Sequence, residues 1–317
     1  MILAVSPNLA LDRVHVVRGY RAGQQCRAVR SFLQPGGSGV HATSVIQSLG
    51  GQAVAMGLLG GHAGDLWRAE ALARRLTADL LDIPGETRES FCLIDLDLGN
   101  VVESVEAGPH VHPEALSALL ARLDQYLTQA EMLVVSGSLP PGFTGEGYVE
   151  MAKLARRHHL PVLADLHGEQ LRQILAAGPW LIKPSLSEFD ALVGHETRDL
   201  AERERLSQEL HRDSGAIVAL SMSGDGLLVT GPQGQWVLLP PAVDVHLPGG
   251  RGRNVIGCGD ALVGALAHEY CQTGDLLSAA RMGMAAAHCT LGTFGVPEID
   301  AERVRSLAPA VGLEIRN

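Results

Sequence analysis

The sequence is poor in cysteine, and the few cysteines that it has lie far apart. Among its 317 residues there are five cysteines, and no two of them form a Cys-x-x-Cys pair. This spacing fits neither a disulfide framework nor a zinc site. Scattered thiols are typical of a reducing compartment, so we expect a cytoplasmic protein. The cysteines are Cys26, Cys92, Cys258, Cys271 and Cys289.

The chain also lacks an excess of basic residues and any long apolar run. It has 25 Lys and Arg against 35 Asp and Glu, which gives a net charge of -10. Nucleic acids and anionic membrane surfaces attract basic proteins, so this balance argues against both as partners. No apolar stretch reaches the roughly 20 residues that cross a bilayer, and residues 1–5 favour a strand over a signal peptide. A small anionic ligand is still compatible with this charge balance if its site is locally positive.

Apolar runs alternate with helical segments along the whole chain, without an internal repeat, a low-complexity segment or a linker. From residue 112 onward the alternation is regular, which predicts βαβ units with right-handed crossovers. The strands expected there cover residues 132–136, 161–165 and 181–183. Length and pattern together predict one α/β domain over residues 1–317, with a mostly parallel central sheet flanked by helices.

Two segments depart from this rhythm. Residues 13–33 contain stretches that alternate apolar and polar side chains, and residues 90–105 read as a hairpin around Asp97-Leu98-Gly99-Asn100. Between them, the run from Gln34 to Gly39 interrupts the strand pattern at Gln34-Pro35 and opens a helix. We expect the two segments to form a small separate sheet that projects from the main domain.

A glycine-rich stretch, Gly257-Cys258-Gly259-Asp260, precedes an apolar run of helical length. The first amides of a helix have no partner within it and lie at the positive end of its dipole, so such a start can hold a phosphate. Asp260 inside an anion site is explained if it takes the proton of an acceptor hydroxyl. It would also suit an ordinary helix cap, and these residues alone leave both interpretations open. The same helix start is expected to lower the pKa of the Cys258 thiol.

The run from Gly37 to Ala42 satisfies the loose dinucleotide pattern G-x-G-x-x-A, which would indicate a Rossmann-type dehydrogenase. However, no acidic residue follows about 20 positions later to hold a ribose. The G-x-x-x-x-G-K-[ST] phosphate loop is also absent from the sequence. A phosphotransferase with this sequence must therefore use another kind of phosphate site.

Short motifs are distributed over essentially the whole chain. They are Ser6-Pro7-Asn8-Leu9-Ala10-Leu11-Asp12-Arg13, Pro35-Gly36-Gly37-Ser38-Gly39, Thr87-Arg88, Ser136-Gly137-Ser138-Leu139-Pro140-Pro141-Gly142, Lys183-Pro184, Ser223-Gly224-Asp225-Gly226 and Gly257–Asp260. In residues, order and spacing the sequence resembles the ribokinase-like (PfkB) sugar kinases. Within that family it is similar to the branch of 1-phosphofructokinase and tagatose-6-phosphate kinase, for which the motif from Ser136 to Gly142 is specific.

The resemblance implies a ribokinase-like fold with a small β-sheet lid, at approximately residues 13–33 and 90–105, often shared in a homodimer. It implies an ATP-dependent carbohydrate kinase that uses Mg2+ and in which Asp260 is the general base. The amides of Gly257, Cys258 and Gly259 would hold the charge of the transferred phosphoryl group. The other implied contacts are Asp12, Gly36 and Gly37 with the sugar, Lys183, Ser223, Gly224 and Gly226 with the nucleotide, and Glu188 with Mg2+ through water.

Several positions depart from the family pattern. Cys258 stands where alanine is usual, which keeps a small side chain. Ser185 replaces the asparagine of the Asn-x-x-Glu element that ends in Glu188, and a hydroxyl can still order a metal-bound water. The branch's lysine and asparagine donors to the substrate's phosphate are Ser38 and His41 here. Protonated His41 is expected to replace one of these donors.

Arg88 is retained from the family's phosphate-binding element and can hold a phosphate through two hydrogen bonds. Its neighbour Glu89 would compete for Arg88 or repel that phosphate, and a surface pair of Arg88 with Glu86 or Glu89 is the alternative. A ketohexose phosphate, such as fructose 1-phosphate or tagatose 6-phosphate, is the first expected acceptor. An unphosphorylated sugar or polyol is the alternative acceptor, and a catalytically weak sugar sensor is the alternative function.

Overall fold

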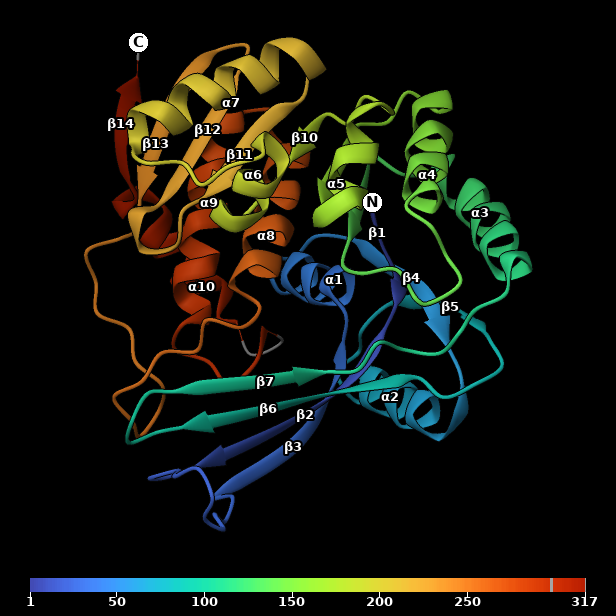
Figure 1. Cartoon of the computed structure of the whole chain (residues 1–317), viewed down its shortest axis with the longest axis vertical. Helices are drawn as coiled ribbons and strands as arrows, with labels where there is room; N and C mark the ends of the chain where they lie inside the picture. Colours follow the sequence, from blue (N-terminus) through green and yellow to red (C-terminus); the bar gives the residue numbers. More distant parts are fainter. Residues whose placement is uncertain (297–298, 317) are drawn as a thin grey trace.

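The computed structural model describes residues 1–296 and 299–316, whose strands form two sheets (Figure 1). The larger sheet consists of β1 (Ile2–Asn8), β4 (Ala53–Leu59), β5 (Ala78–Asp82), β8 (Met132–Ser136), β9 (Val162–Asp165), β10 (Leu181–Ile182), β11 (Ile217–Ser221), β12 (Leu227–Gly231), β13 (Gly234–Leu239) and β14 (Gly312–Arg316). Its order is β14-β13-β12-β11-β10-β9-β8-β1-β4-β5. The smaller sheet consists of β2 (Ala10–Val17), β3 (Arg30–Gly36), β6 (Arg88–Asp95) and β7 (Val101–Val105), in the order β3-β2-β6-β7.

The larger sheet is parallel from β5 to β11 and antiparallel from β11 to β14. The strands expected near residues 132–136, 161–165 and 181–183 are present as β8, β9 and β10. The outermost strands β5 and β14 were not predicted from the sequence. Their side chains are only partly buried, and their sequences contain no continuous apolar run. The mostly parallel sheet, the flanking helices and the separate small sheet confirm the predicted α/β fold class.

Helices cover both faces of the larger sheet. One face carries α1 (Ser38–Ser48), α8 (Cys258–Thr273), α9 (Leu276–Thr290) and α10 (Ala301–Leu307), and the other carries α3 (Pro113–Leu127), α4 (Glu146–Arg157), α5 (Gly168–Leu175), α6 (Leu186–Val193) and α7 (Leu200–Ser214). In β1, Ile2 and Ala4 join the first core, while Leu3 and Val5 join the second. Successive side chains of a strand point to opposite faces, so a strand covered on both faces becomes a continuous apolar run.

No helix of the described residues has the length and apolar character needed to cross a membrane.

The smaller sheet lies at the opposite end of the molecule from the C-terminus, next to α2 (Gly61–Ala73) (Figure 1). The hairpin expected around residues 97–100 is present between β6 and β7. At the end of β6, the buried Asp95 carboxylate accepts hydrogen bonds from four backbone amides, those of Gly19, Tyr20, Asp97 and Leu98. On its inner side, apolar residues of β2 and β6 pack against Leu247 and Phe294. The sheet is thereby attached to the C-terminal part of the chain.

The expected strand break at Gln34-Pro35 is wrong, because β3 continues to Gly36 and α1 begins at Ser38. β3 is an edge strand of the smaller sheet. A proline at an edge can turn its missing N–H side away from the ladder, so it costs no hydrogen bond there. The strand therefore leads directly into the glycines that precede α1.

The parallel strands bring polar residues from distant motifs to one edge of the larger sheet. β1 ends at Asn8, β8 ends at Ser136, β9 ends at Asp165, and Lys183 follows β10. Because all these strands run in the same direction, their carboxyl ends meet at the same edge, which is where ligands bind in open α/β sheets. Since β2 starts at Ala10, directly after β1, the smaller sheet begins at this same edge.

Helix α8 packs directly on α1, and a glycine makes their close approach possible. A Cβ atom added to Gly264 of α8 would lie 2.6 Å from the carbonyl oxygen of Ala42 in α1. Ala42 and its neighbours on both helices are buried, so neither backbone can move away easily. This contact fixes the start of α8 relative to the start of α1.

Gly264→Ala is expected to destabilise the protein, since overpacking of this kind typically costs about 1–3 kcal/mol. The midpoint of urea unfolding, followed by circular dichroism, should fall. Gly147→Ala in α4 is a matched control, because its added Cβ would meet Leu116 at an ordinary 3.5 Å. Alanine favours a helix over glycine by about 1 kcal/mol, so the control should keep or raise the midpoint. Equal midpoints for the two variants would contradict the packing argument.

Candidate active site

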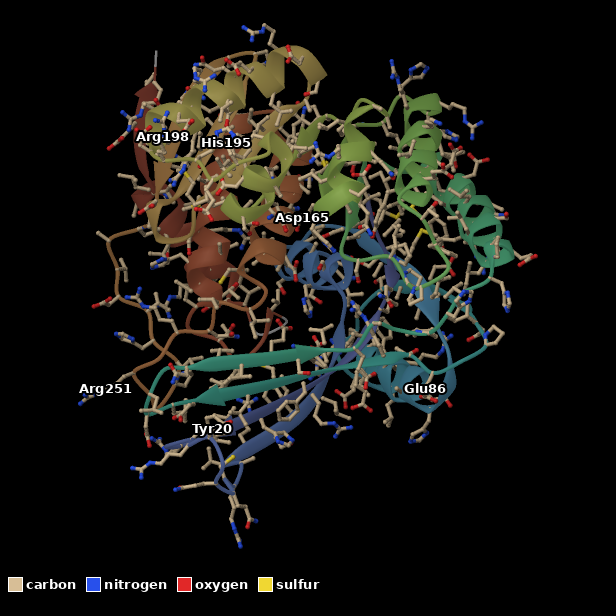
Figure 2. All side chains as sticks on the ribbon, in the orientation of Figure 1. Tyr20, Glu86, Asp165, His195, Arg198 and Arg251 are labelled. Carbon is tan, nitrogen blue, oxygen red and sulfur yellow. The ribbon has the colours of Figure 1, made fainter. Side chains whose placement is uncertain are left out.

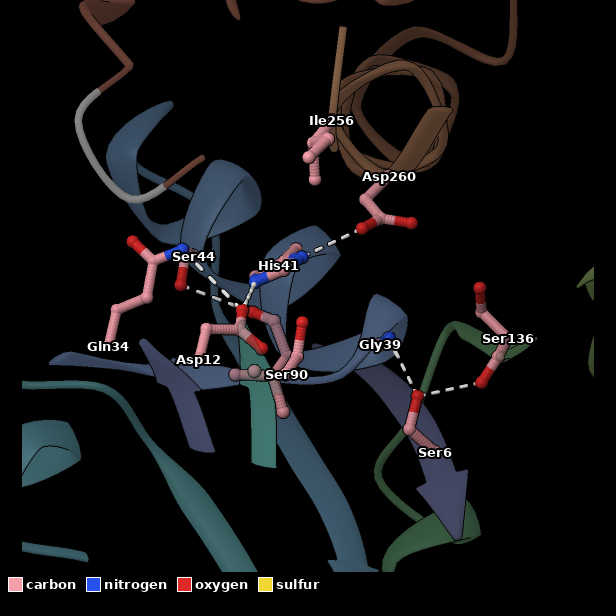
Figure 3. A network of polar contacts seen from close by, with 12 residues as sticks. Ser6, Asp12, Gln34, Gly39, His41, Ser44, Ser90, Ser136, Ile256 and Asp260 are labelled. Atoms are coloured by element: carbon pink, nitrogen blue, oxygen red, sulfur yellow. Dashed lines mark hydrogen bonds and ion pairs between the residues drawn. The ribbon is translucent and has the colours of Figure 1, made fainter. Parts of the chain in front are cut away.

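Three side chains predicted from separate motifs meet where β2, α1 and α8 converge (Figure 3). The Nδ1 atom of His41 lies 2.7 Å from Oδ2 of Asp260, and its Nε2 atom lies 3.2 Å from Oδ2 of Asp12. The side chains of His41, Asp12 and Asp260 are only 8%, 13% and 16% exposed. The site therefore contains a largely buried imidazole between two carboxylates.

His41 is charged at neutral pH. Burial alone would disfavour the imidazolium, but the contacts with Asp12 and Asp260 outweigh it and raise the pKa of His41 to about 10. Nδ1 forms a hydrogen bond with Asp260, whereas Nε2 lies at an ion-pair distance from Asp12 without the geometry of a hydrogen bond. His41 was expected to replace one donor to a substrate phosphate, and both of its ring nitrogens lie against carboxylates.

The glycines of the Pro35–Gly39 motif leave room for this arrangement. A Cβ atom on Gly36 would lie 2.2 Å from Oδ1 of Asp12, so only glycine lets that carboxylate occupy its place. Gly37 has a φ angle of 122°, a conformation that other residues rarely adopt. The amide of Gly39 donates to Oγ of Ser6 at 2.7 Å, and Ser6 Oγ donates to the Ser136 carbonyl at 2.7 Å. These bonds tie the start of α1 to β1 and β8.

Asp260 lies in the first turn of α8, but it does not cap the helix. The N-cap residue is Gly257, which has a left-handed φ of 79° and no side chain that could accept a bond. A Cβ atom on Gly257 would lie 2.0 Å from Cγ2 of Val296, so glycine is required there. The carboxylate of Asp260 instead contacts His41. Of the two interpretations from sequence, the geometry favours a role other than capping.

Cys258 does not have the lowered pKa that the helix start led us to expect. Burial raises the pKa of its thiol to about 12, and the neighbouring charge of Asp260 acts in the same direction. Desolvation of the thiolate therefore outweighs the helix dipole. The Cys258 amide also has a long hydrogen bond, 3.4 Å to the Val255 carbonyl. The expected lowering of the Cys258 pKa was wrong.

Lys183 lies beside the start of α8 and forms a buried ion pair. Its Nζ is 2.9 Å from Oδ1 of Asp165, and the two side chains are 6% and 14% exposed. Burial disfavours the ammonium, but the Asp165 carboxylate outweighs this and raises the pKa of Lys183. A Cβ atom on Gly259 would be 3.6 Å from Lys183 Nζ, so the ammonium faces the glycines before Asp260.

Asp165 itself was missed by the sequence analysis. It is the last residue of β9, and its side chain is 14% exposed; it lies near the centre of the view in Figure 2, whereas Arg198 and Arg251 lie at the periphery. Ser136 Oγ donates to its Oδ2 at 3.3 Å. The sequence could have indicated Asp165 as a site residue, because it is the last residue of the expected strand 161–165 and so lies at the same sheet edge as Lys183.

Glu188 is partly committed to the structure of α6. Its Oε2 accepts from the Ser185 amide at 2.7 Å, and its own amide donates to Ser185 Oγ at 3.4 Å, which together form a capping box. Within the described residues, no three His, Cys, Asp or Glu side chains are grouped as a metal cage. Mg2+ often binds through substrate phosphates and waters with one or two carboxylates, so the second oxygen of Glu188 fits an indirect role.

The turn after β11 contains the expected nucleotide residues. Ser221 donates its amide to the Pro184 carbonyl at 2.9 Å, which places this turn beside the Lys183 segment. Gly226 has a φ of 99°, and a Cβ there would lie 2.1 Å from the Leu238 carbonyl, so the hairpin requires glycine. The packing around Gly224 does not require glycine, because a Cβ atom there would meet nothing within 4 Å. The open side of Gly224, next to Ser223, leaves room for a ligand.

Arg88 is held by backbone carbonyls. Its Nη2 donates to the Asn8 carbonyl at 2.9 Å and its Nη1 to the Glu106 carbonyl at 3.2 Å. The buried Nε has no hydrogen-bond partner among the described residues. Glu89 pairs with Arg13 at 3.2 Å and Glu86 accepts from the Ala63 amide, so the alternative surface pairs of Arg88 are absent from the described residues.

The surroundings of Arg88 contain both a pocket and a further acid. Arg88 lines a pocket together with Gly85, Glu86, Thr87, Glu106, Ala107, Gly108, Pro109 and His110. Glu103 on β7 was missed by the sequence analysis, and no local pattern singles it out. Burial and the charge of Asp12 raise the pKa of Glu103, which shows that the two carboxyl groups are close. The acceptor side of the site therefore holds more acids than were expected.

Comparisons with known proteins show the family to which the chain belongs. Residues 9–301 match the model of the pfkB family carbohydrate kinases. The 1-phosphofructokinase of Rhodobacter capsulatus is 31% identical over 98% of this chain and 96% of its own length. The ATP-dependent 6-phosphofructokinase isozyme 2 of Mycobacterium tuberculosis is 28% identical over 97% of this chain and 89% of its own.

The fold has close counterparts among solved structures. A possible 1-phosphofructokinase of Thermotoga maritima superposes with a TM-score of 0.91 over 100% of both chains, at 24% identity. The family match covers most of the chain, and the relative from Rhodobacter capsulatus extends it to nearly the whole length. The chain therefore belongs to the pfkB family of carbohydrate kinases, enzymes that transfer a phosphoryl group from ATP to a sugar hydroxyl.

Proposed function

We propose that this kinase phosphorylates a hydroxyl of a ketohexose phosphate, with fructose 1-phosphate or tagatose 6-phosphate as the first candidates and Asp260 as the general base. The observation that carries the proposal is the position of Asp260. It lies at the start of α8, across His41 from Asp12, and the Nζ atom of Lys183 faces the adjacent Gly259. The relative named 1-phosphofructokinase supports the acceptor class.

The arrangement gives each group a part in one transfer step. Asp12 and the backbone at Gly36 and Gly37 hold the acceptor sugar. Oδ1 of Asp260 takes the hydroxyl proton as the acceptor oxygen forms its bond to phosphorus. The bond from that phosphorus to the leaving oxygen breaks, and ADP departs with the electron pair. Lys183 and the backbone amides of Gly257, Cys258 and Gly259 stabilise the charge of the phosphoryl group.

The nucleotide is assigned to the side of Lys183, and its residues are Lys183, Ser223, Gly224 and Gly226. Gly224 supports this assignment, because its open side lets a ligand approach the backbone. ATP supplies the phosphoryl group, and Mg2+ neutralises part of its phosphate charge. Glu188 would hold that Mg2+ through water, with the carboxylate oxygen that the helix cap does not use.

The phosphate of the acceptor is assigned to Arg88 and the pocket that it lines. The guanidinium donates to two backbone carbonyls and forms no ion pair with Glu86 or Glu89 among the described residues, so its positive charge is available to a phosphate in this pocket. Two observations favour the second candidate, a kinase for an unphosphorylated sugar or polyol. Two nitrogens of Arg88 already donate to carbonyls, and Glu103 adds negative charge near Asp12.

We also propose a cytoplasmic homodimer that forms through the smaller sheet, which would then act as a lid over the sugar. The exposed apolar side chains Val29, Leu98, Val102 and Val105 lie on or beside its strands, and a partner would cover them. The five cysteines are free thiols, as is typical of a reducing compartment.

Asp260→Asn should abolish most turnover while ATP still binds. Loss of a general base typically lowers kcat by about 10²- to 10⁴-fold. Steady-state ADP release and equilibrium binding of ATP measure the two properties separately. Asp65→Asn, an exposed residue of α2, is the control and should retain wild-type kcat. An Asp260→Asn enzyme with unchanged kcat would remove Asp260 from the role of base.

ADP release with Mg2+-ATP should occur with fructose 1-phosphate or tagatose 6-phosphate and not with unphosphorylated fructose or tagatose. Arg88→Leu should raise KM for the phosphosugar by about 10- to 100-fold, as expected for a lost charge-assisted hydrogen bond. Arg13→Leu is the control, because Arg13 follows Asp12 on β2 and therefore points to the other face. Turnover of the unphosphorylated sugars alone, insensitive to Arg88→Leu, would instead establish the second candidate.

A further inference from the structure

His41 reaches two functional carboxylates from a single side chain. One ring nitrogen is 2.7 Å from Asp260, the assigned base, and the other is 3.2 Å from Asp12, the assigned sugar ligand. Figure 3 shows the ring between the two carboxylates, with α8 on one side and β2 on the other. Asparagine, which the resembled branch often carries at this position, is shorter and has one donor group. It cannot offer two donors in opposite directions.

The backbone of His41 is itself held in place on several sides. The amide of Gly39 is bound by Ser6, Thr43 Oγ1 donates to the Gly39 carbonyl at 2.8 Å, and α1 contacts α8 at Gly264. The side chain is 8% exposed, so solvent cannot easily replace its contacts. The imidazole is therefore a fixed connection between the smaller sheet, α1 and α8.

The surroundings keep this connection charged. The charged and titratable groups around His41 are Asp12 on β2, Asp260 on α8 and Glu103 on β7, with Arg88 acting on Asp12 and Lys183 acting near Asp260. The two carboxylates that contact His41 outnumber the single positive charge between them. Without the imidazolium, the carboxylates of Asp12 and Asp260 would repel each other.

We propose that His41 is a positioning residue, which holds the base Asp260 and the sugar ligand Asp12 at one fixed separation. It binds Oδ2 of Asp260 and thereby orients the other oxygen, Oδ1, toward the acceptor hydroxyl. This role rests on the proposed function, since it presumes that Asp260 is the base. It differs from the phosphate-binding role that the sequence suggested for His41, because both nitrogens serve protein carboxylates.

The test compares His41→Asn and His41→Gln with the wild-type enzyme. Misplacement of a base by about 1 Å can lower a rate about 100-fold, so kcat should fall by about 10- to 100-fold while KM for ATP stays unchanged. Gln47→Ala, near the end of α1, is the control and should keep wild-type kcat. Unchanged kcat in both His41 variants, with folding verified by circular dichroism, would overturn the proposal.

The pH profile supplies a readout that a merely structural role would not move. His41 must be protonated to hold both carboxylates, and its pKa is about 10. Wild-type kcat should therefore be retained at neutral pH and fall as the pH rises through about 10. The Asn and Gln variants should lack that loss, while titrations of other groups remain in both profiles. The same alkaline loss in wild type and variants would contradict the assignment.

Nitrogen NMR of histidine-labelled wild-type protein tests the charge state without any activity. At pH 8 one imidazole should show both ring nitrogens protonated, and this signal should disappear in His41→Gln. A neutral His41 at pH 8 would overturn the proposal. If Asp260→Asn remains active, the proposed base fails instead, so the two failures are distinguishable.

Discussion

Asp12 and Asp260 belong to different parts of the fold and carry the same charge, and a positive charge between them offsets the repulsion that this would cause in one site. The His41 imidazolium supplies that charge, with its ring nitrogens 2.7 Å and 3.2 Å from the two carboxylates. The smaller sheet contributes Asp12, and α8 contributes Asp260. The geometry of acceptor binding and the placement of the base therefore depend on the same ion contact.

That contact is supported by packing at the edge of the parallel sheet. The Gly264–Ala42 contact sets the distance between α8 and α1, and Ser6 ties the start of α1 to β1 and β8. On the other side of Asp260, the buried Lys183–Asp165 pair brings a fixed positive charge to the start of α8. A charge that develops on a phosphoryl group would meet donors already in place, without a cost for reorganising them.

Much of the fold and part of the site followed from local pattern. The regular alternation after residue 112 predicted β8, β9 and β10, and the hairpin around residues 97–100 is present. Several expectations that depended on the tertiary surroundings of a residue were wrong. The pKa of the Cys258 thiol was expected to fall, but burial raises it. Pro35 was expected to break a strand, but it continues β3, because β3 lies at the edge of the smaller sheet. Asp165 and Glu103 were missed because their roles come from neighbours distant in sequence.

The sequence by itself determined the fold class, the kinase family and the residues that carry its motifs, because turns, helix starts and strand periods are set by residues near one another. The tertiary structure alone decided what those residues contact. His41 was read as a phosphate donor, yet its two nitrogens face Asp12 and Asp260, which lie 29 and 219 positions away in the chain. The charge of a buried group depends on what surrounds it in space, and no local pattern records that.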